Sequence, residues 1–384
     1  MAKKNPLRFP TLTHAEPTKG FIFLGDPHVW SRNPGRRLDN YGKSVLRKLA
    51  AAAKIANEQQ LWPVCLGDLF HEAEENDLAT LSSLIAILKS FDRPVLCAVG
   101  NHDLTETVLT PGTALELLVQ AGALQTLNGN APYAYIEMVD EEEKPVRVLL
   151  GATPYGSEIP VSLAPWTGLS KTVDHEKTKQ ALGADTIIWI THDDLAFDHR
   201  YPGAKETYPI IGVDMVINGH MHLTQKPLNR GNTAWYNPGN FSRLTIDLAQ
   251  QTPKVWSWRA NEKRTMLAAD GLPVTLLNGI ELPHAPAEEI LSLVGRAVKQ
   301  AQLDGMCAGV QEPEAATEIP ATGIATSRFV EKLRADESER RTDDGTVLKE
   351  TIQDVLERRQ PPEKITQIVE RLATMALSQH RENS

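Results

Sequence analysis

Three short apolar runs near the start of the chain each end in glycine followed by aspartate or asparagine. They cover residues 21–24, 63–66 and 95–99. Two Ala- and Leu-rich segments between them, 45–58 and 78–89, have the length and pattern of helices. Short runs of this kind fit strands buried on both faces of a parallel sheet, with helices as the crossovers. We therefore predict a βαβαβ arrangement whose polar residues gather at the carboxyl edge of the sheet.

More elements are expected further along the chain. A hairpin is predicted from 133–138 and 146–151, around the acidic turn 140–144. A short helix is expected at 113–120, and single strands at 186–190, 213–217, 234–236, 243–247 and 254–258. Residues 155–176 form either a rim above the carboxyl edge or a plain surface connection. Alternating helices and strands of these lengths indicate an α/β fold.

Histidine and acidic residues recur at these positions in one order. The motifs are Gly-Asp26-Pro-His28, Gly-Asp68, Gly-Asn101-His102-Asp103, Thr-His192 and Gly-His220-Met-His222. Together they supply the carboxylate, amide and imidazole donors needed to hold two divalent metal ions. In the first and the last motif, two donors stand two residues apart, which puts both side chains on one side of an extended segment. We therefore expect the two side chains of each pair to bind one metal ion from the same side of the chain.

Two metal ions address the chemistry of phosphodiester cleavage. Water is a poor nucleophile and phosphate repels anions. Two ions about 3.5–4 Å apart turn a bridging water into hydroxide and polarise the phosphate oxygens. Mixed nitrogen and oxygen donors suit Mn, Fe or Zn better than Ca or Mg. We expect two Mn ions, with Fe, Zn or Mg as alternatives, and the scarcity of cysteine argues against a structural zinc site.

The order of the motifs resembles the calcineurin-like metallophosphoesterase superfamily over roughly residues 21–240. Within it, residues 67–71 (Gly-Asp-Leu-Phe-His) look like the form found in SbcD-type DNA-repair nuclease subunits. Residues 237–240 (Asn-Pro-Gly-Asn) are similar to the Pro-Gly-Ser stretch of those nucleases. The resemblance implies an α/β fold with two mixed β-sheets packed face to face and flanked by helices, followed by a mostly helical C-terminal extension.

The resemblance also implies a role for each donor. One ion would be held by Asp26, His28 and His222. The other would be held by Asn101, His192 and His220, and Asp68 would bridge the two. His102 would stabilise the transition state or protonate the leaving oxygen, and Asp103 would orient His102. A metal-bridging hydroxide would then attack phosphorus, so the resemblance implies a DNA nuclease.

Other functions use the same residues. A small-molecule phosphodiesterase or a phosphoprotein phosphatase of this superfamily needs the same two metals. A non-catalytic scaffold subunit of a repair or defence complex is expected to have substituted ligands, and none is substituted here. Two departures from the family pattern bear on substrate preference: Pro27 between the first two ligands, and the acids Asp193 and Asp194 after His192. These acids either orient His192, bind a further cation or belong to a solvated loop.

Substrate contacts are expected beside the first motif. The net charge of −9 opposes binding of nucleic acid in general, but a basic run that includes Arg32, Arg36 and Arg37 follows His28. These side chains either track a nucleic-acid backbone or form a solvated face. Trp30 either stacks a base or packs in the interior. His71 either contacts the substrate or packs behind the site.

Composition divides the chain into an N-terminal arm (1–20), a catalytic core (21–260), an extension with a helix (261–304), a linker (305–326) and a helical region (327–384). SbcD-type nucleases use helices beyond the core to bind a coiled-coil ATPase. By analogy, an ATPase subunit or a second copy of this chain is an expected partner beside DNA. The alternative is a helical bundle that packs on itself or on the core. Three cysteines, no apolar run of ~18 residues and no signal peptide predict a cytoplasmic protein without membrane contact.

Overall fold

The structure is a computed structural model. It describes residues 9–34, 37, 39–105, 108–168, 174–197, 203–245, 248 and 251–284. The linker expected at 305–326, the helices expected beyond it, residues 285–304 of the expected extension and Arg36 lie outside these residues. The chain divides into two compact units. The first contains Met1–Arg32, Tyr41–Leu244 and Gln250–His284, and the second contains Asn33–Asn40, Thr245–Ala249 and Ala285–Ser384.

A six-stranded sheet in the first unit carries the predicted βαβαβ arrangement. Its order is β15-β12-β2-β3-β4-β5. The strands are β2 (Gly20–Leu24), β3 (Leu61–Cys65), β4 (Val95–Ala98), β5 (Leu124–Leu127), β12 (Lys254–Arg259) and β15 (Asn278–Glu281). The strands β2 to β5 run parallel, which confirms the arrangement, and β12 is antiparallel to β2. The carboxyl ends of β2, β3 and β4 therefore meet at one edge.

A seven-stranded sheet forms the second layer. Its order is β1-β6-β7-β8-β9-β11-β10. The strands are β1 (Thr11–Leu12), β6 (Ala131–Val139), β7 (Pro145–Thr153), β8 (Thr186–His192), β9 (Met215–Gly219), β10 (Leu228–Arg230) and β11 (Thr233–Tyr236). The antiparallel pair β6 and β7 confirms the predicted hairpin, whereas β7, β8, β9 and β11 run parallel. Each of the two sheets contains both parallel and antiparallel pairs of strands, so both are mixed, as the resemblance implies.

The core lies between the two sheets. Phe21 and Phe23 on β2 pack in one cluster with Trp62 of β3, Ile188 of β8 and other fully buried side chains of both sheets. Burying a side chain of this size stabilises the folded chain by about 1.5–3 kcal/mol. A second cluster covers the outer face of the seven-stranded sheet, around Trp189. These two clusters hold the strand ends in place at the edge where the motifs lie.

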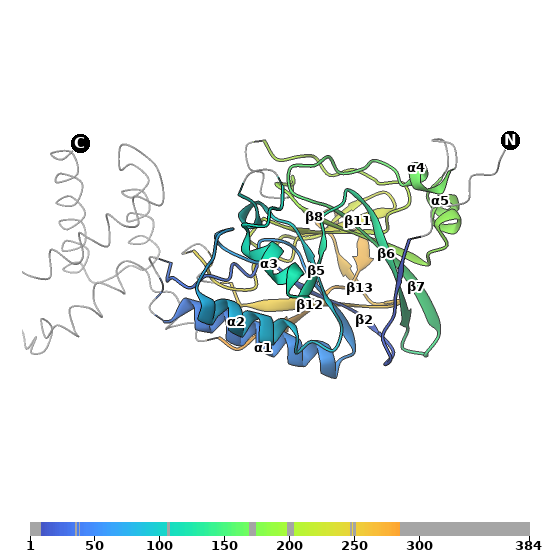
Figure 1. Ribbon diagram of the computed structural model, residues 1–384. Helices are drawn as coiled ribbons and strands as arrows, with labels where there is room; N and C mark the ends of the chain where they lie inside the picture. The colour runs from blue at the N-terminus through green and yellow to red at the C-terminus, as the bar shows by residue number, and fades with distance from the viewer. Residues whose placement is uncertain are drawn as a thin grey trace, which may run out of the picture. The chain divides into compact units, whose positions relative to one another are not determined.

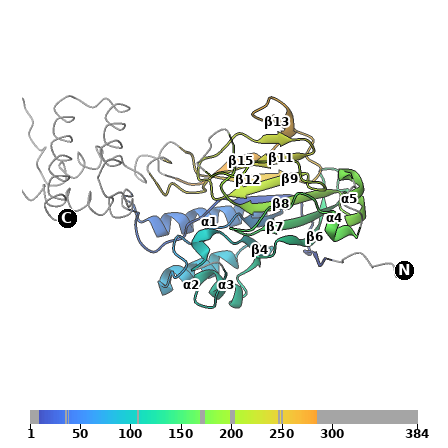
Figure 2. The same ribbon diagram turned by 90° about the horizontal axis from the view of Figure 1, so that it is seen from above.

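Helices flank both sheets (Figures 1 and 2). The helices α1 (Tyr41–Glu58) and α2 (Leu78–Leu88) lie side by side against the outer face of the six-stranded sheet. The helix α1 buries Val45, Leu49, Ala52 and Ala56, which share one face at helical spacing. The short helices α4 (Ala164–Thr167) and α5 (His175–Leu182) lie beside the seven-stranded sheet, and α3 (Ala114–Gln120) precedes β5. In the described part of the chain, no helix combines the length and the apolar character needed to cross a membrane.

Some elements differ from the sequence-based prediction. The expected strand 243–247 does not form over 243–245, the part of it that the structure describes. There Arg243 donates from Nε to the carbonyl oxygen of Gln251 at 2.8 Å, so this segment is a loop held by a side chain. Beyond residue 260, β15 joins β12, and β13 (Thr265–Leu267) pairs with β14 (Pro273–Thr275) in a separate ribbon. The sequence had indicated no strand in that stretch.

Candidate metal centre

The two sheets deliver the predicted donors to one place. Asp26 and Asp68 follow the carboxyl ends of β2 and β3, and His192 is the last residue of β8. The imidazole of His192 lies 3.9 Å from Asp26 (Nδ1 to Oδ1) and 3.2 Å from Asp68 (Nε2 to Oδ2). Residues far apart in the sequence and on different sheets therefore share a site. The site arises because parallel strands end at one edge of their sheet.

Four of the candidate ligands have an unusual backbone conformation. The φ angles are 37° at Asp26, 46° at His28, 46° at Asp68 and 69° at His220. Residues with a side chain rarely adopt positive φ, and strain of this kind costs about 1–3 kcal/mol per residue. The strain is concentrated at strand ends that carry donors. The fold therefore holds these donors in place against a local preference of the chain.

Glycines in the motifs allow the loops to approach one another. A Cβ on Gly67, whose φ is +107°, would lie 2.3 Å from Nδ1 of His192. A Cβ on Gly100 would lie 2.2 Å from Oδ1 of Asp68. No real side chain fits at such distances. Gly67 and Gly100 are thus required for the donors of neighbouring loops to converge.

One group of donors consists of Asp26, His28 and His222. The Nε2 atoms of His28 and His222 lie 3.1 Å apart, and Nε2 of His28 lies 3.8 Å from Oδ2 of Asp68. Asp26, His28 and Asp68 are buried almost completely. Burial, followed by the charges of nearby histidines, lowers the pKa of His28 well below its usual range. A neutral His28 has the lone pair that metal binding requires.

A second group consists of Asp68, His192 and His220. His192 donates from Nδ1 to the carbonyl oxygen of Leu66 at 2.8 Å, which turns its Nε2 toward Asp68. Nδ1 of His220 lies 3.0 Å from Oδ1 of Asn101. Asp68 contacts histidines of both groups, so it stands where a bridging ligand is expected. Each predicted donor therefore lies within one of two adjoining groups.

Unsatisfied buried atoms show that the donor set suits cations. Both carboxylate oxygens of Asp26, Oδ2 of Asp68 and Nε2 of His192 are buried and make no hydrogen bond within the described residues. Burial raises the pKa of Asp26 to about 8. Burial alone would raise the pKa of Asp68, but the nearby imidazolium of His192 holds it well below its usual range. Buried polar groups normally have partners, and divalent ions would supply partners of the right charge here.

The predicted acid–base residues differ from expectation in one contact. His102 donates from Nδ1 to the carbonyl oxygen of His71 at 2.7 Å, and its backbone N–H donates to Asp68 at 2.8 Å. We expected Asp103 to orient His102. Instead, the carboxylate of Asp103 accepts from the backbone N–H groups of Gly100 (3.0 Å) and Phe70 (3.2 Å). Asp103 thus joins the two ligand loops, and the backbone of His71 orients the ring of His102.

The residues predicted to contact substrate lie in different surroundings. Trp30 is only 7 % exposed, and its ring centroid lies 4.4 Å from that of His71. His71 in turn stacks on His102 at 5.3 Å. The side chain of Arg32 is 72 % exposed, with its guanidinium 6.0 Å from the ring of Trp30. Arg37, in the second unit, donates to both carboxylate oxygens of Asp39 at 2.7 Å, so its charge is already neutralised locally.

His28, His71 and His102 form a third group of possible donors. This group shares His28 with the first group. An ion in the third group would therefore compete with an ion in the first group for the ring of His28. Burial lowers the pKa of His71 to about 4, which keeps its ring neutral at physiological pH. The rings of His71, His102 and Trp30 form a wall beside the first group, and the ring centroid of His28 lies 5.5 Å from that of His71 and 5.0 Å from that of His102.

Two residues at the site escaped the sequence reasoning. The ring of Tyr155 lies 5.5 Å from that of His220 and is 40 % exposed, although it belongs to a segment with no motif. Asn240 is buried, and neither its amide oxygen nor its amide nitrogen has a partner among the described residues. Its backbone N–H donates to the carbonyl oxygen of His222 at 2.8 Å. The sequence signal for Asn240 was its place after a Pro-Gly pair, but that pair did not indicate a buried amide.

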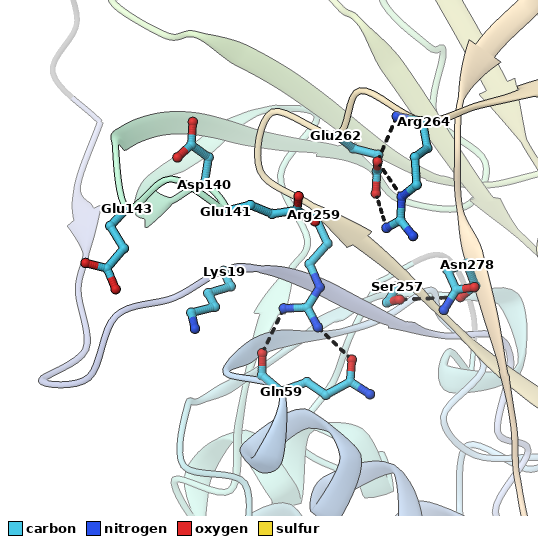
Figure 3. Close-up of a pocket in the computed structure, with 10 residues that line it drawn as sticks. All are labelled: Lys19, Gln59, Asp140, Glu141, Glu143, Ser257, Arg259, Glu262, Arg264 and Asn278. Carbon is cyan, nitrogen blue, oxygen red and sulfur yellow. Dashed lines mark hydrogen bonds and ion pairs between the residues drawn. The ribbon is translucent and has the colours of Figure 1, made fainter.

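A separate cavity of about 460 Å³ lies at the other end of β2, where Lys19 precedes the strand (Figure 3). Arg259 in its wall donates to the backbone and side-chain oxygens of Gln59 at 3.1 and 2.8 Å. Arg264 pairs with Glu262 at 2.6 Å. Both arginines therefore have acceptors beside them. The cavity shares no residue with the three donor groups.

Several solved structures resemble this chain at low identity. A 5'-nucleotidase precursor from Thermus thermophilus is 14 % identical, with a TM-score of 0.38 over 76 % of this chain and 60 % of that one. GAP50, the anchor in the inner membrane complex of Plasmodium, is 14 % identical, with a TM-score of 0.35 over 80 % and 99 %. A dimetal phosphatase from Danio rerio is 12 % identical, with a TM-score of 0.36 over 70 % and 100 %. Similarities of this size carry no argument about substrate.

The chain thus spans 60 % of the length of the nucleotidase precursor. No curated protein matches it significantly. Its sequence does match the family described as calcineurin-like phosphoesterase over residues 20–223, which is more than half of the 384 residues. The matched region contains every donor of the groups described above. The chain therefore belongs to the calcineurin-like phosphoesterase family and is a metal-dependent hydrolase of phosphoesters.

Proposed function

We propose that this hydrolase is a two-metal nuclease that cleaves DNA phosphodiesters. The observation that carries the proposal is the wall formed by His71, His102 and Trp30 directly beside the first donor group. Its sequence form, Gly-Asp-Leu-Phe-His at residues 67–71, resembles SbcD-type nucleases. The exposed guanidinium of Arg32 lies next to Trp30 and 3.6 Å from Glu72 (Nη1 to Oε1), and it would exchange this ion pair for a phosphate of a polyanionic backbone.

We assign one ion to Asp26, His28 and His222 and the other to Asn101, His192 and His220, with Asp68 between them. When bound, the two ions would activate water and polarise the phosphate oxygens. Mixed imidazole and oxygen donors favour Mn, with Fe, Zn or Mg as alternatives.

The protein groups would position the phosphate and manage a proton. His102 has its Nδ1–H engaged by the carbonyl of His71, so only Nε2 is free to hold a proton for the departing oxygen. A general acid placed in this way contributes about 10²–10⁴-fold to the rate. The ring stack on His71 keeps His102 from rotating. The backbone N–H of His102 donates to Asp68, which fixes the proposed general acid, His102, beside the bridging carboxylate.

A substrate panel tests the proposal. Wild-type protein loaded with Mn, Mg or Zn should be incubated with single-stranded DNA, duplex DNA, RNA, a generic aryl phosphodiester and small nucleotides. We expect Mn-dependent cleavage of DNA, and we expect His102→Ala to lose about 10²–10⁴-fold in rate while still binding metal. The proposal fails if the loaded wild type cleaves no diester and behaves like His102→Ala. Cleavage confined to small nucleotides or phosphoproteins would identify a small-molecule phosphodiesterase or phosphatase instead.

A partner belongs to the same proposal. A coiled-coil ATPase, or a second copy of this chain, would bind through the segment 327–384, which lies outside the described residues. Purification of the full chain from its native cells, followed by measurement of its mass in solution, distinguishes the two. An isolated monomer with full activity on DNA would contradict both.

A further inference from the structure

The carboxylate of Asp194 lies against the outer nitrogen of His220. Oδ2 of Asp194 and Nε2 of His220 are 3.3 Å apart. The other ring nitrogen, Nδ1, faces the amide oxygen of Asn101 at 3.0 Å. The side chain of His220 is 19 % exposed and that of Asp194 is 49 % exposed, so the contact lies at the rim of the second donor group.

This contact determines which nitrogen of His220 carries hydrogen. A carboxylate only accepts hydrogen bonds, so Nε2 must donate to Asp194. In the neutral imidazole the lone pair then lies on Nδ1, and it faces an oxygen of Asn101 that also has lone pairs. Two acceptors that face each other at 3.0 Å repel unless a cation lies between them. The arrangement therefore suits an ion bound by Nδ1 of His220 and Oδ1 of Asn101.

The loop that carries Asp194 is held firmly. Asn218, which is fully buried, accepts from the backbone N–H of Asp193 at 3.1 Å and donates to the carbonyl oxygen of Asp193 at 3.0 Å. The side chain of Lys205 pairs with Asp193, and the backbone N–H of Lys205 donates to the carbonyl oxygen of Asp194 at 2.9 Å. These contacts hold the backbone of Asp193 and Asp194 in place. The fold thus sets the backbone position from which the carboxylate of Asp194 reaches His220.

The ring of His220 is also packed. Tyr155 lies over it with its ring centroid 5.5 Å away at an interplanar angle of 43°. The ring of His192 approaches at 5.1 Å. The rings of Tyr155 and His192 therefore hinder a rotation of the His220 ring that would exchange its Nδ1 and Nε2. Asp194 supplies the hydrogen bond that selects one of the two ring orientations.

We infer that Asp194 is a positioning residue that holds His220 in the tautomer and orientation needed to bind the second ion. The inference rests on the metal assignment of the proposed function. Histidines that bind metals commonly donate their other ring N–H to a carboxylate, and loss of that partner costs about 10–100-fold in metal affinity. From the sequence, we expected Asp194 to orient His192, to bind a further cation or to belong to a solvated loop; its contact with His220 was not predicted.

Metal binding tests the inference without any assay of cleavage. Mn²⁺ should be titrated into the full-length wild type, Asp194→Ala and Asp194→Asn by calorimetry, with electron paramagnetic resonance to detect coupling between paired ions. We expect two ions in the wild type. In Asp194→Ala the second ion should bind about 10–100-fold more weakly, with no change at the first site and with loss of the coupling signal at stoichiometric Mn²⁺. In Asp194→Asn the amide oxygen still accepts from Nε2, so the second ion should keep most of its affinity.

A charge control completes the design. Glu158→Gln removes one negative charge from an exposed acid near Tyr155 in the sequence and should leave both affinities unchanged. The inference is overturned if Asp194→Ala binds both ions with an affinity within about twofold of the wild type, where the expected loss is far larger. Equal weakening in the Ala and Asn variants would also overturn it, because the hydrogen bond would then not be the cause. A wild type that binds fewer than two ions would overturn the metal assignment as well, which separates the two failures.

Discussion

The Nε2 atoms of His28 and His222 lie 3.1 Å apart, although 194 residues separate the two histidines in the chain. Both rings belong to the first donor group. Two ring nitrogens at this distance are suited to share one cation, because each presents a lone pair to the same point. The pair therefore offers a direct measure of whether the first ion is bound as proposed.

His222→Ala should reduce bound Mn from two ions to one. Ions that bind only the folded state stabilise it, by about 2.7 kcal/mol at 100 times the dissociation constant. The rise in Tm on addition of Mn, and its reversal by a chelator, should therefore be smaller in the variant. Metal content after dialysis and thermal unfolding check both effects. His14→Ala removes a histidine near the surface and serves as the control; an unchanged stoichiometry in His222→Ala would contradict the assignment.

Gly67→Ala should destabilise the protein and disturb the second donor group. The new Cβ would lie 2.3 Å from Nδ1 of His192, at a φ of +107°. Gly122→Ala is the matched control, because Gly122 also has positive φ (+62°) but has nothing within 4 Å of its Cβ position. The control should cost about 1–2 kcal/mol from backbone strain. Urea unfolding should show a larger loss for Gly67→Ala, and equal losses would mean that close approach is not the reason for glycine here.

Asn218→Ala should lower the free energy of unfolding by about 3 kcal/mol or more, because several buried polar groups lose their partners. The amide of Asn218 accepts from Thr191 at 2.8 Å and donates to Asn237 at 2.9 Å, besides its bonds to Asp193. Denaturant unfolding measures the loss. Asn128→Ala, at an exposed position, should change stability little. A loss below about 1 kcal/mol, the contribution of a single hydrogen bond, would show that the hydrogen bonds of the Asn218 amide are not needed for stability.

Tyr236→Phe should alter the response of stability to alkaline pH. Burial raises the pKa of Tyr236 well above its usual range, and its hydroxyl donates to the carbonyl oxygen of Thr275 at 2.7 Å. An unfolded tyrosine ionises near pH 10. Above that pH the unfolded state binds fewer protons than the folded state, so stability falls as pH rises. Between pH 8 and 11 the wild type should lose about 1.4 kcal/mol from this group.

The phenylalanine variant lacks that loss. The difference in unfolding free energy between wild type and Tyr236→Phe should therefore shrink by about the same amount over this pH range. Paired urea titrations at pH 8 and pH 11 measure it. A difference that stays constant would mean that Tyr236 ionises alike in the two states.

The sequence predicted the architecture wherever local patterns were strong. Apolar runs such as 21–24 ended in glycine and a donor, and β2, β3 and β4 appear there as parallel strands. Over 243–245, the described part of the strand expected at 243–247, the chain forms a loop instead, in which Arg243 is buried and donates to Gln251. The strand β15 was not predicted because Asn278–Glu281 is short and exposed, and its pairing with β12 is a tertiary effect.

The sequence likewise predicted one part of the candidate site and not another. Residue type and order were enough to predict that Asp26, His192 and His220 converge. They could not indicate that Asp103 bonds to backbone amides rather than to His102, since backbone donors leave no mark in the sequence. Nor could they place Tyr155 over His220, because that contact depends on how the segment after β7 crosses the sheet edge.

The left-handed backbone at Asp26, His28, Asp68 and His220 has a consequence for protein engineering. Glycine at any of these positions would relieve local strain of about 1–3 kcal/mol. A screen for thermostable variants that selects on melting temperature in the absence of metal would therefore favour replacement of the residues that the reaction needs. Directed evolution of this chain should be performed with metal present and with turnover as a second criterion, since stability and activity make opposite demands at these positions.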